Sequence, residues 1–284
     1  MTQRNAATAQ ATVLVDELVR CGVRDIVLAP GSRSAALAFA VHAAAAADRI
    51  RLHVRVDERS AGFLALGLAR TSRRPVPVVT TSGTAVANLH PAVLEASHAG
   101  LPLVVLSADR PAGLRGTNAN QTTDQVKIFG DAARAFADVP PAFPGATEEA
   151  QVASWRSLVA RTVATAQGRT AHAPGPVHVN VQFAEPLTPD LDDGWSAACA
   201  GRPDGRPWTT PAEPVAAQPE RLDGDRRTVL VAGDDAGPPA RILAERSGWP
   251  LLAEPTSGSR TGPNAIRGYR LLLGDAALAE RIER

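Results

Sequence analysis

The sequence predicts an α/β protein with a parallel sheet, followed by a second and smaller α/β unit. Three observations support this fold class. Short apolar segments of strand length alternate with segments whose apolar residues recur at helical spacing. Apolar residues make up 44% and charged residues 21% of the 284-residue chain, a balance typical of proteins that bury a core. A Pro-rich stretch without periodicity, residues 186–226, separates the two alternating regions.

The first region, residues 1–185, contains five predicted strands. Because helices separate these strands, they are expected to run parallel within one sheet. Gly22 follows the first helix at the position of a C-cap. The predicted strands are residues 25–29, 51–56, 76–80, 103–107 and 176–181, and the predicted helices are 11–21, 34–46, 58–69, 84–98 and 147–166.

The second region begins after the Pro-rich stretch, which we interpret as a linker. Residues 228–232, 250–253 and 270–273 are predicted strands, and residues 240–246 a predicted helix. Sheets typically hold about 4–6 strands, so three strand candidates are few for a complete domain. We therefore expect residues 227–284 to be the start of an α/β domain that is incomplete in this chain.

Composition and charge exclude several classes of protein. The 30 basic and 29 acidic residues give a formal charge of +1, which provides no general field for nucleic acid or anionic lipid. Two cysteines cannot form a disulfide framework in a chain of this length, which favours a reducing compartment. No apolar run approaches the ~18 residues of a membrane span, and residues 1–21 lack the apolar stretch of a signal peptide. A soluble, cytoplasmic protein is expected.

Four loops follow predicted strands, at the edge of a doubly wound sheet where ligands bind: residues 29–34, 57–60, 80–84 and 107–111. In the first loop, backbone N–H groups lie beside the guanidinium of Arg33, a combination suited to a carboxylate or phosphate. The alternative is a simple turn in which Ser32 caps a helix. The same two interpretations, anion binding or a purely structural turn, apply to Arg110. Two arginines on neighbouring strand ends favour an anionic substrate.

Glu58 follows a strand and opens a helix, so its carboxylate could simply favour the helix dipole. No dinucleotide-binding or P-loop glycine motif follows any strand. The histidines at 53, 90, 98 and 178 lack the spacing of a metal site or a nucleophile partner, and we interpret them as core or surface residues.

Five motifs, however, occur here together: PGSRS at 30–34, DERSAGFLALGLA at 57–69, TSGTAVAN at 81–88, SADRP at 107–111 and NQT at 120–122. The DER and TSGTAVAN motifs are found broadly in thiamine diphosphate enzymes, whereas the other three mark one branch. The chain resembles that branch, the family of menaquinone-pathway 2-succinyl-5-enolpyruvyl-6-hydroxy-3-cyclohexene-1-carboxylate synthases. The likeness covers nearly the whole chain, including EPTSGSRTG at residues 254–262.

The resemblance implies that residues 1–185 are a pyrimidine-binding domain and that the second region begins a central domain. It implies decarboxylation of 2-oxoglutarate on thiamine diphosphate, then addition of the succinyl carbanion equivalent to isochorismate. In such enzymes a carboxyl group hydrogen-bonded to a pyrimidine nitrogen promotes the imino tautomer of the cofactor's amine, which deprotonates the thiazolium carbon. The resemblance assigns this role to Glu58.

The other site residues are also assigned by resemblance. Isochorismate would be held where two cations suit a dicarboxylate. The substrate-binding residues implied are Ser32, Arg33, Arg110, Asn120 and Gln121, and those around the pyrimidine are Pro30, Thr81 and Gly83, together with Glu58.

The chain departs from the family in one respect. Thiamine enzymes bind the diphosphate through Mg²⁺ or Mn²⁺ held by a Gly-Asp-Gly motif with a later Asn, and no segment of this sequence qualifies. We therefore predict no metal ligands here, a diphosphate-binding domain outside this chain, and no catalysis by the chain alone. Either the sequence is an N-terminal fragment or the missing half is a separate polypeptide. The family also implies a dimer or a dimer of dimers.

Two other functions remain open. One is a different thiamine diphosphate-dependent 2-oxo acid decarboxylase or carboligase, against which the two arginines argue. The other is a non-catalytic binding or dimerisation module that kept the pyrimidine-domain fold.

Overall fold

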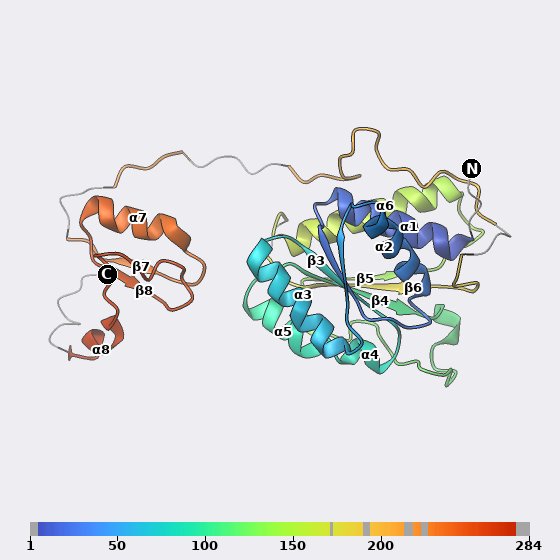
Figure 1. The fold of residues 1–284 in the computed structure, drawn as a ribbon, viewed down its shortest axis with the longest axis horizontal. Coiled ribbons are helices and arrows are strands. Elements are labelled where there is room, and N and C mark those ends of the chain that lie inside the picture. Colours follow the sequence, from blue (N-terminus) through green and yellow to red (C-terminus); the bar gives the residue numbers. More distant parts are fainter. Residues whose placement is uncertain (1–4, 171–172, 190–193, 213–217, 223–226, 277–284) are drawn as a thin grey trace. The chain divides into compact units, whose positions relative to one another are not determined.

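The computed structural model of the protein describes residues 5–170, 173–189, 194–212, 218–222 and 227–276. The chain divides into two compact units, Met1–Glu213 and Pro214–Arg284 (Figure 1).

The first unit is built on a six-stranded parallel sheet with the strand order β2-β1-β3-β4-β6-β5. The predicted α/β class and parallel sheet are confirmed. Most of these strands are buried along their whole length, as expected for a sheet that is covered on both faces. The strands are β1 (Asp25–Leu28), β2 (Arg51–Val54), β3 (Val76–Thr80), β4 (Leu103–Asp109), β5 (Ala135–Val139) and β6 (Val177–Gln182).

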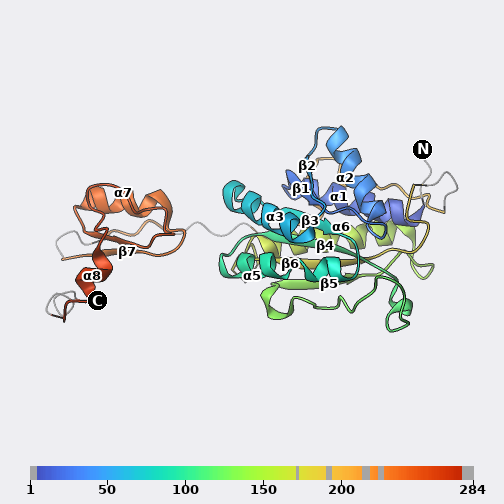
Figure 2. The same ribbon diagram turned by 60° about the horizontal axis from the view of Figure 1, so that its bottom comes forward.

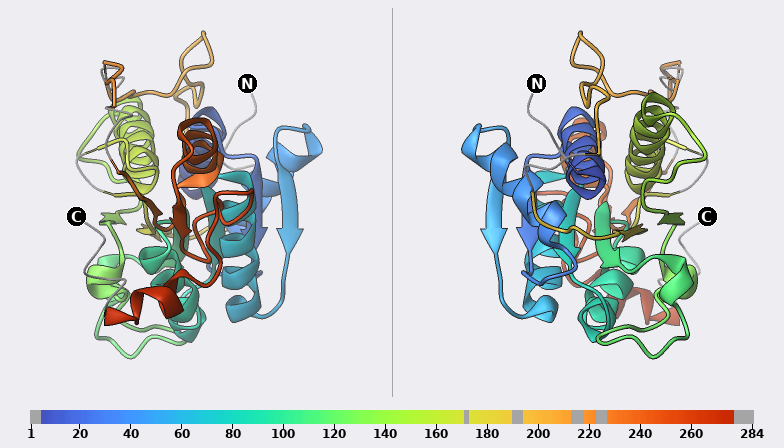
Figure 3. Two further views of the ribbon diagram at one scale, coloured as in Figure 1. Left: turned by 90° about the vertical axis from the view of Figure 1, so that its left-hand side faces the viewer. Right: turned by 90° about the vertical axis from the view of Figure 1, so that its right-hand side faces the viewer.

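Helices cover both faces of this sheet, and each layer has its own apolar cluster. One cluster joins α1 (Ala6–Arg20), α2 (Ala35–Ala46) and α6 (Glu148–Ala166) to the sheet. The other joins α3 (Glu58–Ser72), α4 (Thr84–Ala87) and α5 (His90–His98) to its opposite face. Figure 2 brings the α3 and α5 layer forward, and Figure 3 shows the two layers on opposite sides of the strands. Helices therefore cover both faces of the sheet, and a ligand can reach it at the loops that follow the strands.

Two elements of this unit differ from the prediction. The predicted helix 84–98 is two helices, since α4 ends at Ala87 and α5 starts at His90 with Pro91 in its first turn. Proline is favoured there and disfavoured inside a helix, which accounts for the break. Strand β5 was not predicted. It is a short edge strand that contains Asp138 and is only partly buried, so its apolar signal is weak.

The first unit also extends past the predicted boundary at residue 185. Trp195 is buried and stacks on Trp155 of α6, with ring centroids 5.4 Å apart. Arg156, which is fully buried, donates to Glu17 of α1 at 2.6 Å and to the carbonyl oxygen of Cys199. The first part of the predicted linker 186–226 thus packs on the unit. Residues 190–193, 213–217 and 223–226 of that linker lie outside the described residues.

The second unit pairs β7 (Leu230–Ala232) with β8 (Leu251–Ala253) in parallel, joined by α7 (Gly237–Ser247). The predicted strand at 270–273 is wrong, because these residues lie in helix α8 (Tyr269–Leu273). An apolar run this short has no periodicity that separates strand from helix. Across the described parts of both units, no helix has the length and apolar character needed to cross a bilayer.

Candidate functional site

The two predicted arginines lie at the same edge of the sheet, although the strands that precede them are not neighbours. Arg33 follows β1 and Arg110 follows β4, and β3 lies between these strands. The prediction of neighbouring strand ends is therefore wrong in its topology. Burial and the positive charge of Arg110 nevertheless both lower the pKa of Arg33, against the opposing effect of Glu185 and Asp109. Both cations thus act at the same edge of the sheet.

Arg33 is largely buried and has unused hydrogen-bonding capacity. Its side chain is 12% exposed, donates to the carbonyl oxygen of Phe183 at 3.1 Å and lies 3.6 Å from a carboxylate oxygen of Glu185. Its Nε atom is buried and has no hydrogen-bond partner in the described structure. A buried donor without a partner is costly, so an anionic ligand that accepts from Arg33 would stabilise this arrangement.

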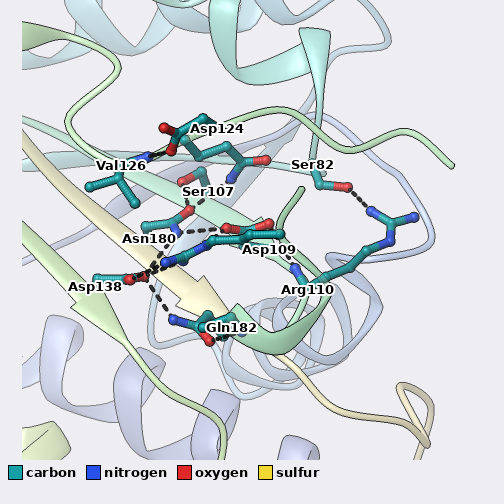
Figure 4. Close-up of polar contacts among 12 residues, drawn as sticks. Ser82, Ser107, Asp109, Arg110, Asp124, Val126, Asp138, Asn180 and Gln182 are labelled. Atoms are coloured by element: carbon teal, nitrogen blue, oxygen red, sulfur yellow. Dashed lines mark hydrogen bonds and ion pairs between the residues drawn. The ribbon is translucent and has the colours of Figure 1, made fainter. Parts of the chain in front are cut away.

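Arg110 is bound to the loop that follows β3. Its guanidinium donates to Ser82 Oγ at 2.8 Å and to the carbonyl oxygen of Gln121 at 2.9 Å (Figure 4). Its backbone N–H donates to Asp109 at 2.8 Å. The structure therefore brings Arg110 and Gln121 together. Asn120 is exposed, and its carbonyl oxygen accepts from Thr122.

Gly31 and Thr81 come into very close contact, from the loops after β1 and β3. A Cβ atom on Gly31 would lie 2.4 Å from Thr81 Cβ, so only glycine fits at this position without displacement. Thr81 is buried, and its Oγ1 has no hydrogen-bond partner in the described structure. Pro30 and Ser32, on either side of Gly31, are exposed. We call this close Gly31–Thr81 contact, with the unpartnered Thr81 hydroxyl group, the Gly31–Thr81 cradle.

Gly83 begins α4 with φ +85°, a left-handed conformation that favours glycine. Its N–H donates to the side-chain oxygen of Gln125 at 2.9 Å. A Cβ atom at Gly83 would lie 3.0 Å from the carbonyl oxygen of Gln121. The loop after β3 is therefore hydrogen-bonded to Gln125 and leaves no room for a larger residue at Gly83 beside Gln121.

Glu58 is the first residue of α3, which follows the edge strand β2. The helix is capped by the preceding residue, Asp57, whose carboxylate accepts from Ser60 N–H at 2.7 Å. Glu58 is half-buried, and no other described residue forms a hydrogen bond or ion pair with its carboxylate. Because Asp57 already caps the helix, Glu58 is available for another role.

Sequence reasoning missed a buried polar network at the ends of β4, β5 and β6. Asn180 donates to Asp109 at 2.9 Å and to Asp138 at 3.0 Å, and Arg115 forms ion pairs with both carboxylates (Figure 4). Burial raises the pKa of Asp138, but hydrogen bonds from Arg115, Gln182 and Asn180 outweigh this and hold the pKa below its ordinary value. One signal was present, since polar residues 178, 180 and 182 alternate with valines along β6.

His178 belongs to the same buried region. It is 1% exposed, its Nε2 lies 2.7 Å from Ser107 Oγ, and its ring packs against Phe129 and Phe136. Burial lowers its pKa from 6.5 to about 4. His178 is therefore a neutral core residue at physiological pH, one of the two interpretations made from the sequence.

Replacing His178 should change how stability depends on pH. The folded state binds this proton more weakly than the unfolded state, so the free energy of unfolding falls as the pH drops from 6.5 to about 4. The loss should approach about 3 kcal/mol. We expect His178→Gln to unfold with a flatter pH profile between pH 7 and 5 in urea titrations. Exposed His98 provides the control, since His98→Gln should keep the wild-type slope. Equal slopes for wild type and His178→Gln would contradict the assignment.

Comparisons with known proteins relate part of the chain to one family. Residues 9–128 match the family described as "Thiamine pyrophosphate enzyme, N-terminal TPP binding domain". Over these residues the chain is similar to the N-terminal domain of thiamine pyrophosphate enzymes. Thiamine pyrophosphate is another name for thiamine diphosphate. The family match spans the first four strands of the sheet and the loops that carry Glu58, the two arginines and the Gly31–Thr81 cradle.

Two curated proteins to which the chain is similar are named 2-succinyl-5-enolpyruvyl-6-hydroxy-3-cyclohexene-1-carboxylate synthase. The one from Kineococcus radiotolerans is 57% identical over 97% of the chain and 48% of the relative. The one from a Nocardioides species is 55% identical over 98% of the chain and 45% of the relative. The chain spans about half the length of the curated relatives it matches.

The site fits one part of thiamine diphosphate. The unpartnered Thr81 hydroxyl, the cradle at Gly31 and the unpaired carboxylate of Glu58 suit a polar ring such as the pyrimidine. Among the residues that the structure describes, no group of three or more His, Cys, Asp or Glu side chains could hold a metal ion.

Proposed function

We propose that this chain supplies the pyrimidine-binding side of a 2-succinyl-5-enolpyruvyl-6-hydroxy-3-cyclohexene-1-carboxylate synthase of menaquinone biosynthesis. The reaction decarboxylates 2-oxoglutarate and joins the remaining succinyl unit to isochorismate. The observation that carries the proposal is the placement of both arginines beside the Gly31–Thr81 contact: Arg33 follows Gly31 by two residues, and Arg110 donates to Ser82, the residue after Thr81. Two cations at one edge suit a substrate with two carboxylates better than a simple 2-oxo acid. The names of the relatives support the same reaction.

Glu58 is the proton-handling residue in this proposal. When bound, thiamine diphosphate supplies the electron sink that decarboxylation of a 2-oxo acid requires. The Glu58 carboxyl group holds a proton at the pyrimidine ring nitrogen opposite the exocyclic amine and takes it back in turn. This role needs a carboxyl group without a competing ion pair, which describes Glu58.

The remaining residues bind and orient. Arg33 and Arg110 hold the carboxylates of isochorismate, and Ser32, Asn120 and Gln121 lie on the same loops and contribute hydrogen bonds. Thr81 uses its free hydroxyl group toward the pyrimidine, and Pro30 and Gly83 line the ring.

The rest of the active site lies outside this chain. Hard oxygen ligands for Mg²⁺ or Mn²⁺ are provided by a diphosphate-binding domain, within a longer polypeptide or as a separate one. In the assembled enzyme, two subunits form each active site, so a homodimer or a dimer of dimers in the cytoplasm is part of the proposal.

The test combines calorimetry with a substrate panel. We expect the chain alone to bind thiamine diphosphate weakly with Mg²⁺ and to show no turnover. With the diphosphate-binding domain present, it should consume 2-oxoglutarate and isochorismate together. Turnover of other 2-oxo acids without a need for isochorismate would favour a different carboligase. No turnover and no binding in the mixture would favour a non-catalytic module.

A further inference from the structure

A line of hydrogen bonds runs from the loop after β3 into the interior of the sheet. Gln125 is fully buried, and its side-chain oxygen accepts from Gly83 N–H at 2.9 Å. Its side-chain nitrogen donates to Asn180 Oδ1 at 2.7 Å and to the carbonyl oxygen of Ala108 at 3.2 Å. One amide therefore connects the loop to the ends of both β4 and β6.

The orientation of the Gln125 amide is determined by its neighbours. Asn180 donates to the carboxylates of Asp109 and Asp138 (Figure 4). An ionised carboxylate can accept but cannot donate, so the Nδ2 atom of Asn180 must face them. Its Oδ1 atom then accepts from Gln125 and from Ser107 Oγ at 2.8 Å. Gln125 must consequently present its nitrogen to Asn180 and its oxygen to Gly83. The side-chain amides of Gln125 and Asn180 thus have all their donors used and their oxygens accepting, which specifies a single geometry for the pair.

We propose that Gln125 is a positioning residue that holds residues 81–83 in the conformation that receives the cofactor and, through Ser82, sets the place of Arg110. Gly83 has a positive φ that glycine adopts readily, and Gln125 fixes this residue by accepting from its N–H group. Ser82, the preceding residue, accepts from Arg110 at 2.8 Å. The inference rests on the proposed function for the identity of what binds there.

Two substitutions separate this role from simple packing. Gln125→Ala removes all three hydrogen bonds. Gln125→Glu keeps the shape, but an ionised carboxylate would present an oxygen to Ala108 O and Asn180 Oδ1, which are both acceptors. The protonated acid can donate one hydrogen bond and still accept from Gly83 N–H. The glutamate variant should thus recover as the pH falls.

The charged groups around this position support such a titration. Burial and the carboxylates of Asp109 and Asp138, on β4 and β5, disfavour a third negative charge. Arg110 and Arg115 oppose this effect but are already bound to other groups. His178 on β6 stays neutral above about pH 5, since burial lowers its pKa to about 4.

The first measurement is hydrogen exchange at the Gly83 amide, followed by NMR as a protection factor. We expect protection to fall about tenfold in Gln125→Ala at pH 6 and pH 8. In Gln125→Glu it should fall similarly at pH 8 and recover at pH 6. Gln151 is the matched control, because this buried amide bonds to three backbone groups of residues 143 and 146. Gln151→Glu should leave protection at Gly83 unchanged.

The second measurement is the affinity for thiamine diphosphate with Mg²⁺ and the diphosphate-binding domain. We expect Gln125→Glu to weaken it about tenfold at pH 8 and less at pH 6, in parallel with protection at Gly83. Unchanged protection in both Gln125 variants, or lower protection with unchanged affinity, would overturn the proposal. If the wild type binds thiamine diphosphate and shows these Gln125 effects but does not use isochorismate, the positioning role is supported and the proposed reaction is contradicted.

Discussion

Substituting Glu58 by glutamine should lower kcat by about 10²–10⁴-fold in the assembled enzyme, because an amide can hydrogen-bond to the pyrimidine nitrogen but cannot exchange a proton with it. The fold should survive. Glu58 has no partner among the described residues and Asp57 caps α3, so the variant loses only a favourable interaction with the helix dipole. That loss should be about 0.3–1 kcal/mol.

Steady-state kinetics and urea unfolding together test this expectation. Glu149 is the matched control, since it is an exposed glutamate in the first turn of α6. Glu149→Gln should lose similar helix stability and keep full activity. Near-normal turnover of Glu58→Gln would refute the proton-handling role. A large loss of stability in Glu58→Gln would mean that the residue is structural.

The framework of the first unit could be predicted because local signals and tertiary packing agree there. Residues 25–29, 76–80 and 103–107 are short apolar segments between helical patterns, and their side chains are buried in the sheet. The loops after these strands could also be identified, because parallel strands end at one edge. Glu58 lies at that edge, as the first residue of α3, which follows β2.

Strand order could not be deduced from chain order. Arg33 and Arg110 follow β1 and β4, which β3 separates, so their loops share an edge of the sheet without being adjacent; the charge of Arg110 still lowers the pKa of Arg33. Pro91 divides a helix that apolar periodicity alone would continue. The predicted strand at residues 270–273 is wrong for a different reason: an apolar run this short is compatible with a strand or a helix.

The buried polar network escaped prediction because its members are far apart in the sequence. Gln125 comes from a loop and Asn180 from β6, and only the register that pairs Ser107 with Asn180 brings these groups together. A lone Asn or Gln in a sequence carries no indication of such partners. Polar alternation along β6 was the one local sign that this strand end is not ordinary core.

Replacing Gly31 by alanine should disable cofactor binding through a single added methyl group. The new Cβ would lie 2.4 Å from Thr81 Cβ and 2.6 Å from its Cγ2. Thr81 is buried and β-branched, so it cannot rotate away without strain, and the cradle must open. Overpacking of this kind typically costs about 1–3 kcal/mol. We expect the free energy of unfolding to fall by that amount and calorimetry to detect no binding of thiamine diphosphate.

The second glycine needed for comparison lies in α3. Gly67 is exposed, and a Cβ atom there would meet nothing within 4 Å. Because alanine favours a helix over glycine, Gly67→Ala should raise the free energy of unfolding by about 0.5–1 kcal/mol and leave cofactor affinity unchanged. If Gly31→Ala lowers the free energy of unfolding and Gly67→Ala raises it, the effect at residue 31 comes from the Gly31–Thr81 contact and not from the loss of a glycine. If Gly31→Ala bound thiamine diphosphate as tightly as the wild type, the cofactor could not lie against that cradle.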